Sequence, residues 1–270
     1  MKNKKKREKK AVICCITILS VIIIASLFAF LSPYDPDQVD LMHKFEAPGF
    51  EHWFGTDNYG RDYFTRAIYG GRVSLLVGVF SMIVSIIVGT IYGIISGYTS
   101  GLVDAVMMRF VDILMAVPSF LIIITLNVYL NAGMTTMILT IGFFSWMGIA
   151  RIVRAEVLSL RERDFVLAAK GLGAGTWWLI TKHFVRNVIS PVMVAASISI
   201  ANAILTESTL SYLGFGIKTP KASWGSMLQD AQTYILSKPM LAFYPGCLIL
   251  VTVLCFNVLG DTLKNKVEVK

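Results

Sequence analysis

Long apolar runs without a single charge alternate along this chain with short polar segments. A helix of about 20 apolar residues is long enough to cross the hydrocarbon core of a membrane. The runs predict six such helices, at residues 11–31, 73–98, 110–130, 134–150, 188–206 and 239–260. We therefore expect an all-α integral membrane protein.

The run from Ile113 to Ala150 is too long for one helix, since it holds 38 residues without a charge. Asn127, Asn131 and Gly133 are expected to break it into a hairpin. Pro118 is expected to kink the first arm or to mark where a neighbour bonds the freed carbonyl. The first run, at 11–31, is longer than the apolar part of a cleaved signal peptide and no clear cleavage site follows it, so we expect a retained anchor.

Composition agrees with a lipid environment, because only 16% of the residues are charged, against about 25% in soluble domains. The net charge is +8, and 18 of the 25 Lys and Arg residues fall in four segments that share one side if the amino terminus is inside. The positive-inside rule then places both termini in the cytoplasm. The predicted organisation is a basic tail (1–10), a first transmembrane helix (11–31), an extracellular loop (32–72), a transmembrane domain (73–260) with a cytoplasmic loop at 151–190, and a cytoplasmic tail (261–270).

Small residues recur at every fourth position of the second predicted helix, at Ser81, Ser85, Gly89, Gly93 and Gly97. Such stripes let helix backbones approach closely where no hydrophobic effect drives association. The stripe predicts close packing, either within this chain or against another subunit.

Charged residues at the membrane margins are also informative. Arg109 and Asp112 are three apart near the start of the third helix and are expected to pair. Glu207 lies toward the outer end of the fifth helix. It is either a structural acid that neighbouring groups satisfy or a group that lines a pathway.

The cytoplasmic loop has the pattern of a short helical elbow. Apolar or small residues fall at helical spacing at Phe165, Ala168, Ala169 and Leu172. Gly171, Gly173 and Gly175 then permit a turn.

A second short helix is expected after this turn, with Thr176 as its N-cap. Trp177, Ile180 and Phe184 follow at i, i+3 and i+7. We expect two helices at an angle, anchored by aromatic residues, that form a rigid protrusion able to transmit force.

This segment resembles the EAA loop of permease subunits in ATP-binding-cassette importers. Ala168, Ala169 and Gly173 match that motif, whereas Leu167 replaces its glutamate and Arg186 replaces its later proline. Because of these two departures, the resemblance supports the loop itself but no specific salt bridge within it. The resemblance implies a set of residues that couple to an ATPase: Asp164, Ala168, Ala169, Gly171, Gly173, Trp177 and His183.

Three further segments resemble the second permease of dipeptide, oligopeptide and nickel importers. They are residues 52–72, residues 104–118 (DAVMMRFVDILMAVP) and residues 207–228 (ESTLSYLGFGIKTPKASWGSML). The first contains the signature residues Gly55, Thr56, Asp57, Gly60, Arg61, Asp62 and Arg66. With the elbow, the segments cover most of residues 45–260 in the expected order, and the chain is similar to the peptide/nickel permease family.

The resemblance implies a division of labour among several chains in a bacterial plasma membrane. This chain and a sister permease would form the pathway, two cytoplasmic ABC ATPases would hydrolyse ATP, and an extracellular solute-binding protein would deliver the solute. The chain contains no Gly-x4-Gly-Lys-Ser/Thr pattern that could hold ATP phosphates. We therefore expect no enzyme activity, no cofactor and no nucleic-acid partner for this chain itself.

The external segments leave two roles open. Residues 49–72 suit an ordered loop with ion pairs of Asp57 or Asp62 with Arg61 or Arg66. This loop serves either as a structural clasp at the mouth or as a contact for the binding protein. Turn-forming residues between 211 and 240 are compatible with a gate, and the candidate pathway or gate residues are Glu207, Gly214, Gly216, Pro220, Trp224 and Gly225.

Peptides are the expected cargo, and nickel or a metal chelate is the alternative. His43 and His52 are lone histidines, and the four cysteines lie in apolar runs without CxxC spacing, so no metal site is expected. Other classes fit less well. A secondary transporter more often has ten or more spans and ionisable residues at the midplane, and an intramembrane metalloprotease would need an HExxH motif that this chain lacks.

Overall fold

The computed structural model describes residues 2–130 and 133–268. Within them the regular structure is helical, apart from one isolated bridge between Thr56 and Asp62. The helices are α1 (Lys2–Leu27), η1 (Ala29–Leu31), η2 (Leu41–His43), α2 (Tyr63–Thr99), α3 (Gly101–Ala116), α4 (Ser119–Tyr129), α5 (Met134–Arg161), α6 (Asp164–Gly171), α7 (Thr176–Leu179), η3 (Ile180–Phe184), α8 (Val185–Tyr212), α9 (Trp224–Gln232) and α10 (Met240–Glu268).

Five helical segments are long and apolar enough to cross a membrane, namely α1, α2, α5, the segment that ends in α8, and α10. Helices α3 and α4, whose axes differ by 75°, are together apolar enough to form a sixth, broken span or a re-entrant loop. Pro118 lies at this break, where its ring and missing N–H stop the helix. The all-α membrane architecture and the kink at Pro118 are therefore confirmed, while Asn131 lies outside the described residues.

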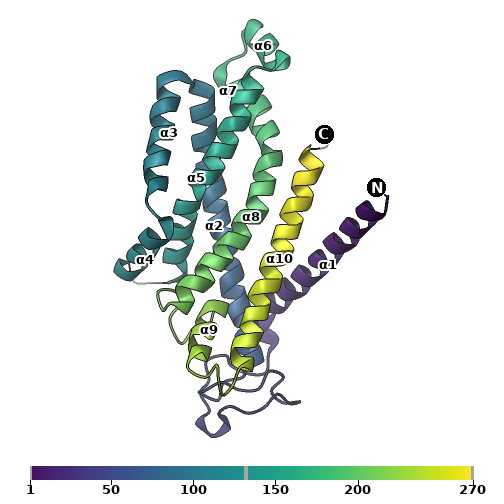
Figure 1. Ribbon diagram of the computed structural model, residues 1–270, viewed down its shortest axis with the longest axis vertical. Coiled ribbons are helices and arrows are strands. Elements are labelled where there is room, and N and C mark those ends of the chain that lie inside the picture. The colour runs from purple at the N-terminus through teal and green to yellow at the C-terminus, as the bar shows by residue number, and fades with distance from the viewer. Residues whose placement is uncertain (1, 131–132, 269–270) are drawn as a thin grey trace.

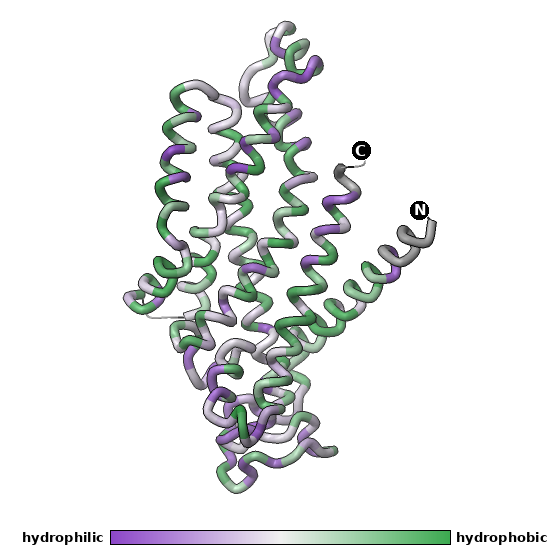
Figure 2. The backbone as a smooth tube through the Cα atoms, viewed as in Figure 1, coloured by the Kyte–Doolittle hydropathy of each residue, from purple (hydrophilic) through white to green (hydrophobic). Residues whose placement is uncertain are grey.

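The helices form an elongated bundle with different polar structures at its two ends (Figure 1). We call the end that carries α6 and α7 the elbow end, and the end that carries residues 32–62 and α9 the loop end. Figure 1 shows that α1 begins and α10 ends on the elbow side. Apolar residues follow the middle of the helices, and hydrophilic residues gather toward the two ends (Figure 2).

Two predicted boundaries are wrong because capping and ion pairing extend the helices. Helix α2 begins at Tyr63, not at residue 73, since the Asp62 side chain accepts a hydrogen bond from the Thr65 amide at 2.7 Å. The loop predicted at 32–72 therefore ends at residue 62. Helix α5 continues to Arg161, so the loop predicted at 151–190 shrinks to residues 162–184.

Arginines inside the extended part of α5 are bound by neighbouring helices. Arg154 holds Asp104 of α3 through two hydrogen bonds of 2.6 Å. Arg161 donates to the Gly97 carbonyl of α2 at 3.1 Å. The predicted pairing of Arg109 with Asp112 is wrong, because Asp112 binds Arg151 of α5 at 2.5 Å. Helix α5 supplies the cations, which is why spacing along α3 alone misled the prediction.

The stripe of small residues on α2 forms a seam with α5 inside this chain. A Cβ atom added at Gly93 would lie 2.6 Å from the Ala150 carbonyl oxygen and 2.8 Å from Val153 Cβ. A Cβ atom added at Gly89 would likewise overlap Ile149, and one added at Gly97 would overlap Val157. The Ser85 hydroxyl adds a hydrogen bond of 3.1 Å to the Gly142 carbonyl. Packing within the subunit, one of the two expected roles, is confirmed for this stripe.

At the loop end, a group of ion pairs around the buried Asp57, Arg61 and Arg66 ties the loop to α2 and α9. We call this group the clasp; its members are Asp37, Asp57, Arg61, Arg66 and Asp230. The Asp57 carboxylate lies 2.7 Å from Arg61 Nε and 3.6 Å from Arg66 Nε. Arg66, only 1% exposed, reaches Asp37 at 3.3 Å, and Asp230 lies 3.7 Å from Arg61 and 4.0 Å from Arg66. Burial raises the pKa of Asp230, and the two guanidinium groups oppose that rise.

The seam yields a first test. Gly93→Val should force α2 and α5 apart, because its Cβ would overlap the Ala150 carbonyl. Overpacking of this kind costs about 1–3 kcal/mol, so the thermal unfolding temperature of the protein purified in detergent should fall by several degrees. Gly148→Val is the matched control, since no heavy atom lies within 4 Å of a Cβ added there. Equal unfolding temperatures for the two variants would contradict the seam.

The clasp yields a second test. Asp57→Ala removes the buried carboxylate that lies nearest to Arg61 and also pairs with Arg66, and breaking a buried pair costs about 3–5 kcal/mol. Unfolding of the purified protein followed by intrinsic fluorescence should therefore show a large loss of stability. Glu51→Ala removes an exposed carboxylate from the same loop and should change stability by no more than about 0.5 kcal/mol. A similar small effect of both substitutions would show that the clasp is dispensable.

Candidate functional site

The elbow consists of residues 162–184 and projects from the bundle on α5 and α8 (Figure 1). Helix α6 ends in a Schellman motif: the Gly173 amide donates to the Lys170 carbonyl and the Ala174 amide donates to the Ala169 carbonyl, both at 3.0 Å. Gly173 has a φ of +83°, which suits a residue without a Cβ atom. The turn predicted from the three glycines is thus present, and Gly173 is the one that requires the left-handed conformation.

The second part of the elbow runs without a break into the membrane span. Gly175, not Thr176, is the residue that precedes α7, so the predicted N-cap is wrong. The Thr176 hydroxyl instead lies 2.9 Å from the Tyr98 hydroxyl at the end of α2. A π-helical turn, η3, then joins α7 to α8.

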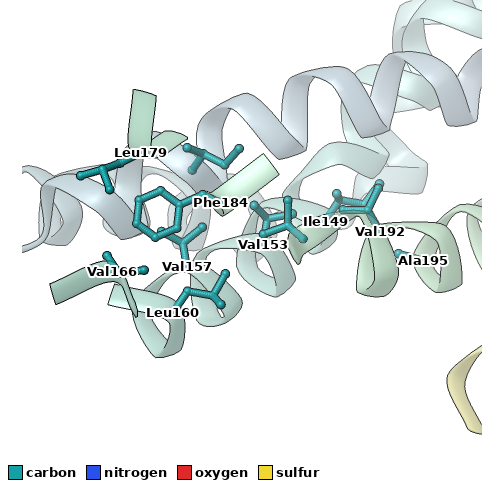
Figure 3. Close-up of a cluster of buried hydrophobic side chains, with 11 residues drawn as sticks. Ile149, Val153, Val157, Leu160, Val166, Leu179, Phe184, Val192 and Ala195 are labelled. Carbon is teal, nitrogen blue, oxygen red and sulfur yellow. The ribbon is translucent and has the colours of Figure 1, made fainter. Parts of the chain in front are cut away.

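The inner face of the elbow is part of the hydrophobic core. Val166, Leu179 and Phe184 are buried together with residues of α5 and α8 (Figure 3). The Phe184 ring also contacts the Tyr98 ring, with their centroids 5.7 Å apart. The elbow is therefore packed against three spans and has little freedom to move separately from them.

The outer face of the elbow exposes large apolar side chains. Leu172 is 89% exposed and Trp177 is 77% exposed. Phe165, Leu167 and Trp178 are exposed as well. Of the aromatic residues expected to anchor the two short helices, Phe184 is buried and Trp177 is exposed. Leu179 is buried beside Phe184. An exposed apolar patch of this kind is typical of a surface that contacts another protein or a membrane.

The other predicted coupling residues lie on or beside this outer face. Asp164 and Ala168 are exposed, and Ala169 is half-buried against the core. Gly171 has open space around it. The His183 ring contacts the Phe165 ring in a tilted arrangement and the Trp178 ring edge-on, with centroids 5.3 and 5.0 Å away. Its Nε2 is buried without a hydrogen-bond partner among the described residues.

The signature residues at the loop end fold the loop on itself. Gly55 and Gly60 have φ values of +73° and +74°, and a side chain on either would overlap the backbone of Glu46 or Asp40. Thr56 donates its hydroxyl to the His43 carbonyl at 2.5 Å. The predicted ion pairs of Asp57 with Arg61 and Arg66 are present.

Asp62 and the two external histidines have roles within the loop. Asp62, besides capping α2, binds His52 Nδ1 at 2.8 Å. His43 binds Asp40 at 2.7 Å, which raises the pKa of His43. Among the described residues no group of three or more His, Cys, Asp or Glu side chains is placed to hold a metal ion. Of the two roles left open for this loop, the geometry supports the structural clasp.

Glu207 lies in a cluster of hydroxyl groups and has no exposed surface. Ser74 of α2 and Ser211 of α8 each donate a hydroxyl to its carboxylate at 2.8 Å. The Ser74 oxygen also accepts a hydrogen bond of 3.3 Å from the Trp224 amide. These contacts match the structural role proposed for Glu207, since each carboxylate oxygen has a partner inside the fold.

The candidate gate residues are packed against the same cluster. The buried Trp224 donates its indole N–H to the Ala67 carbonyl at 2.9 Å. A Cβ added at Gly225 would lie 2.6 Å from Ser208 Cα, and one at Gly216 would overlap Ser211. The Pro220 carbonyl accepts a hydrogen bond from Arg66 at 3.5 Å, while Gly214, with a φ of +86°, turns the chain after α8.

Sequence reasoning missed several residues on which the elbow depends. Tyr98 of α2 contacts it through Thr176, and Val166 is its buried contact on α6. The pair of Arg154 with Asp104 joins α5, which carries the elbow, to α3. Arg154 and Asp104 each lie within about one helical turn of the end of an apolar run. Two opposite charges at the same membrane margin of neighbouring spans could have predicted this ion pair. Nothing in the sequence distinguished Val166 from Phe165 beside it.

Comparison with known proteins identifies a family for this fold. Residues 89–269 match the family model described as the binding-protein-dependent transport system inner membrane component. The oligopeptide transport system permease protein OppC of Escherichia coli (strain K12) is 41% identical over 261 residues, which cover 94% of this chain and 86% of that protein.

Two relatives from Bacillus subtilis (strain 168) show similar agreement. Its oligopeptide transport system permease protein OppC is 39% identical over 256 residues, covering 94% of this chain and 84% of the relative. Its dipeptide transport system permease protein DppC is 39% identical over 254 residues, covering 94% and 79%. On this evidence the chain belongs to the family of binding-protein-dependent transport system inner membrane components.

Proposed function

We propose that this chain is a permease subunit of an ATP-driven peptide importer and forms half of its translocation pathway. The observation that carries the proposal is the two-sided elbow. Its inner face is buried against α2, α5 and α8, and its outer face exposes Leu172 and Trp177. Such a protrusion can receive force from a partner and pass it to the spans.

The partner at the elbow is proposed to be an ABC ATPase, with a second ATPase on a sister permease. The patch is apolar, and the cations Arg163, Lys170 and Lys182 lie in the same segment. A groove with an apolar floor and an acidic rim would fit it. Hydrolysis of ATP is assigned to that partner, because this chain has no phosphate-binding loop of its own.

We place the elbow end in the cytoplasm of a bacterial cell. The basic amino-terminal segment, the start of α1 and the end of α10 lie on that side of the bundle (Figure 1). Lys and Arg residues favour the cytoplasmic side, so both termini are proposed to be cytoplasmic. The loop end with its clasp then faces outward, where a solute-binding protein would deliver the cargo.

Peptides are the cargo we propose. The relatives described above are named as oligopeptide and dipeptide permeases. The nickel alternative finds no support in the external histidines, since each is bound to a carboxylate of its own loop. Closure of the ATPases is proposed to move the elbow with α5 and α8 as one body, which alternates access to the pathway.

The docking surface yields a third test. Trp177→Ala removes an exposed ring without disturbing the buried face. Buried aromatic anchors at interfaces are worth about 2 kcal/mol or more, so affinity for the ATPase should fall at least about tenfold. Co-purification of the ATPase with the tagged permease, together with uptake into vesicles, measures this loss.

The matched control for this test is Trp53→Ala, which removes a tryptophan that is 64% exposed at the opposite end of the bundle. It should leave ATPase co-purification unchanged, and both variants should unfold at the wild-type temperature. Full retention of the ATPase by Trp177→Ala would exclude the outer face of the elbow as the docking surface.

A further inference from the structure

One face of α8 carries hydrogen-bonding side chains that the fold leaves uncovered. Asn202, Thr206 and Thr209 recur at i, i+4 and i+7; Asn202 and Thr209 are exposed and Thr206 is half-buried. These residues belong to a segment apolar enough to span a membrane. We call them the polar stripe.

The exposed faces of α2 and α10 differ from the polar stripe. On α2 the exposed residues include Ile87 and Ile91, and on α10 they include Leu250 and Leu254. Aliphatic side chains suit contact with lipid, whereas polar groups inside a membrane face water or another protein. The polar stripe therefore does not face lipid.

A hollow adjoins the polar stripe between α4, α5 and α8. It measures about 140 Å³ and is lined by Ser119, Ser145 and Thr206 together with Phe120, Phe144, Ile123 and Ile141. The break at Pro118 starts α4 at Ser119, which lies in the wall of the hollow. A hollow with mixed polar and aromatic walls is suited to a small ligand group.

Three hydroxyl groups on this surface, those of Thr206, Thr209 and Ser145, already donate their hydrogens within the fold. Thr206 donates its hydroxyl hydrogen to the Asn202 carbonyl and Thr209 donates to the Leu205 carbonyl, both at 2.8 Å. Ser145 donates to the Ile141 carbonyl at 2.7 Å. A hydroxyl has one hydrogen and two lone pairs. These three hydroxyl oxygens can therefore only accept hydrogen bonds from a bound ligand.

We propose that the polar stripe and the hollow line the translocation pathway and hold a passing peptide by its backbone N–H groups and terminal ammonium. Backbone N–H groups are common to nearly all peptides, and the named residues of this surface carry no charge. The surface therefore binds peptides without regard to the charge of their side chains. This inference rests on the proposed function, since it assigns the transported peptide to this surface.

A contact with the sister permease would leave a different surface. Helix seams in membranes use small residues that let backbones touch, as Gly89, Gly93 and Gly97 do against α5. The polar stripe instead adjoins a hollow, which a close seam between helices would fill. A water-filled pathway explains these features together.

Cysteine accessibility tests the location of the pathway. The experiment uses the complete transporter in proteoliposomes, with the four native cysteines replaced and ATP-driven peptide uptake verified. Asn202→Cys and Thr206→Cys should react with a membrane-impermeant maleimide, and transported peptide should slow the reaction several-fold. Leu250→Cys, on the apolar face of α10, is the control and should react at least about tenfold more slowly. Unreactive Thr206→Cys, or reactivity that peptide leaves unchanged, would overturn the proposal.

A pair of substitutions tests the chemistry. Thr206→Val keeps the shape and removes the acceptor, and a net hydrogen bond of ordinary strength corresponds to roughly a fivefold change in rate. Uptake should fall by about that factor, and equally for acidic, neutral and basic peptides, while Thr206→Ser restores it. An unchanged rate in Thr206→Val, or a loss confined to one peptide charge, would overturn the proposal.

The controls separate this inference from the proposed function. Absence of ATP-driven peptide uptake by the wild-type complex would remove both. Normal uptake, together with an unreactive and substitution-tolerant polar stripe, would remove only the assignment of this surface. Unfolding temperatures of all variants, measured on the purified complex, show that any lost uptake is not lost folding.

Discussion

The close approach of α2 and α5 is the contact on which the rest of this molecule depends. Gly89, Gly93 and Gly97 leave room for Ile149, Val153 and Val157 of α5. The same three α5 residues belong to the core cluster that contains Val166, Leu179 and Phe184 of the elbow. One row of side chains therefore packs against the glycine seam and against the elbow, so a force applied to the elbow acts directly on the seam.

Much of this architecture could be predicted from the sequence because lipid imposes strict rules on it. Uncharged runs of sufficient length, the stripe of small residues and Pro118 gave the spans, the seam and the break. The ends of the helices could not be predicted in the same way. Arg154 and Arg161 looked like loop residues, yet partners on α3 and α2 accommodate them inside a helix.

The candidate site shows the same division between local and tertiary information. The left-handed turn at Gly173 follows from local chemistry, because a residue without a side chain is suited to it. Which aromatic ring faces inward depends on neighbours that are distant in sequence. Trp177 and Phe184 share a helical pattern, and Tyr98 of α2 selects Phe184 as the buried ring.

Helix α8 connects the elbow to the polar stripe, and its two faces make different contacts. On one face Glu207 is bound by Ser74 of α2 and Ser211, so this side of α8 is fixed to the seam helix. On the other face the polar stripe remains uncovered. The helix also continues from the elbow through η3 without an intervening loop. A displacement of the elbow would therefore be passed to the polar stripe and to α2 together, as the proposed alternation of access to the two sides of the membrane requires.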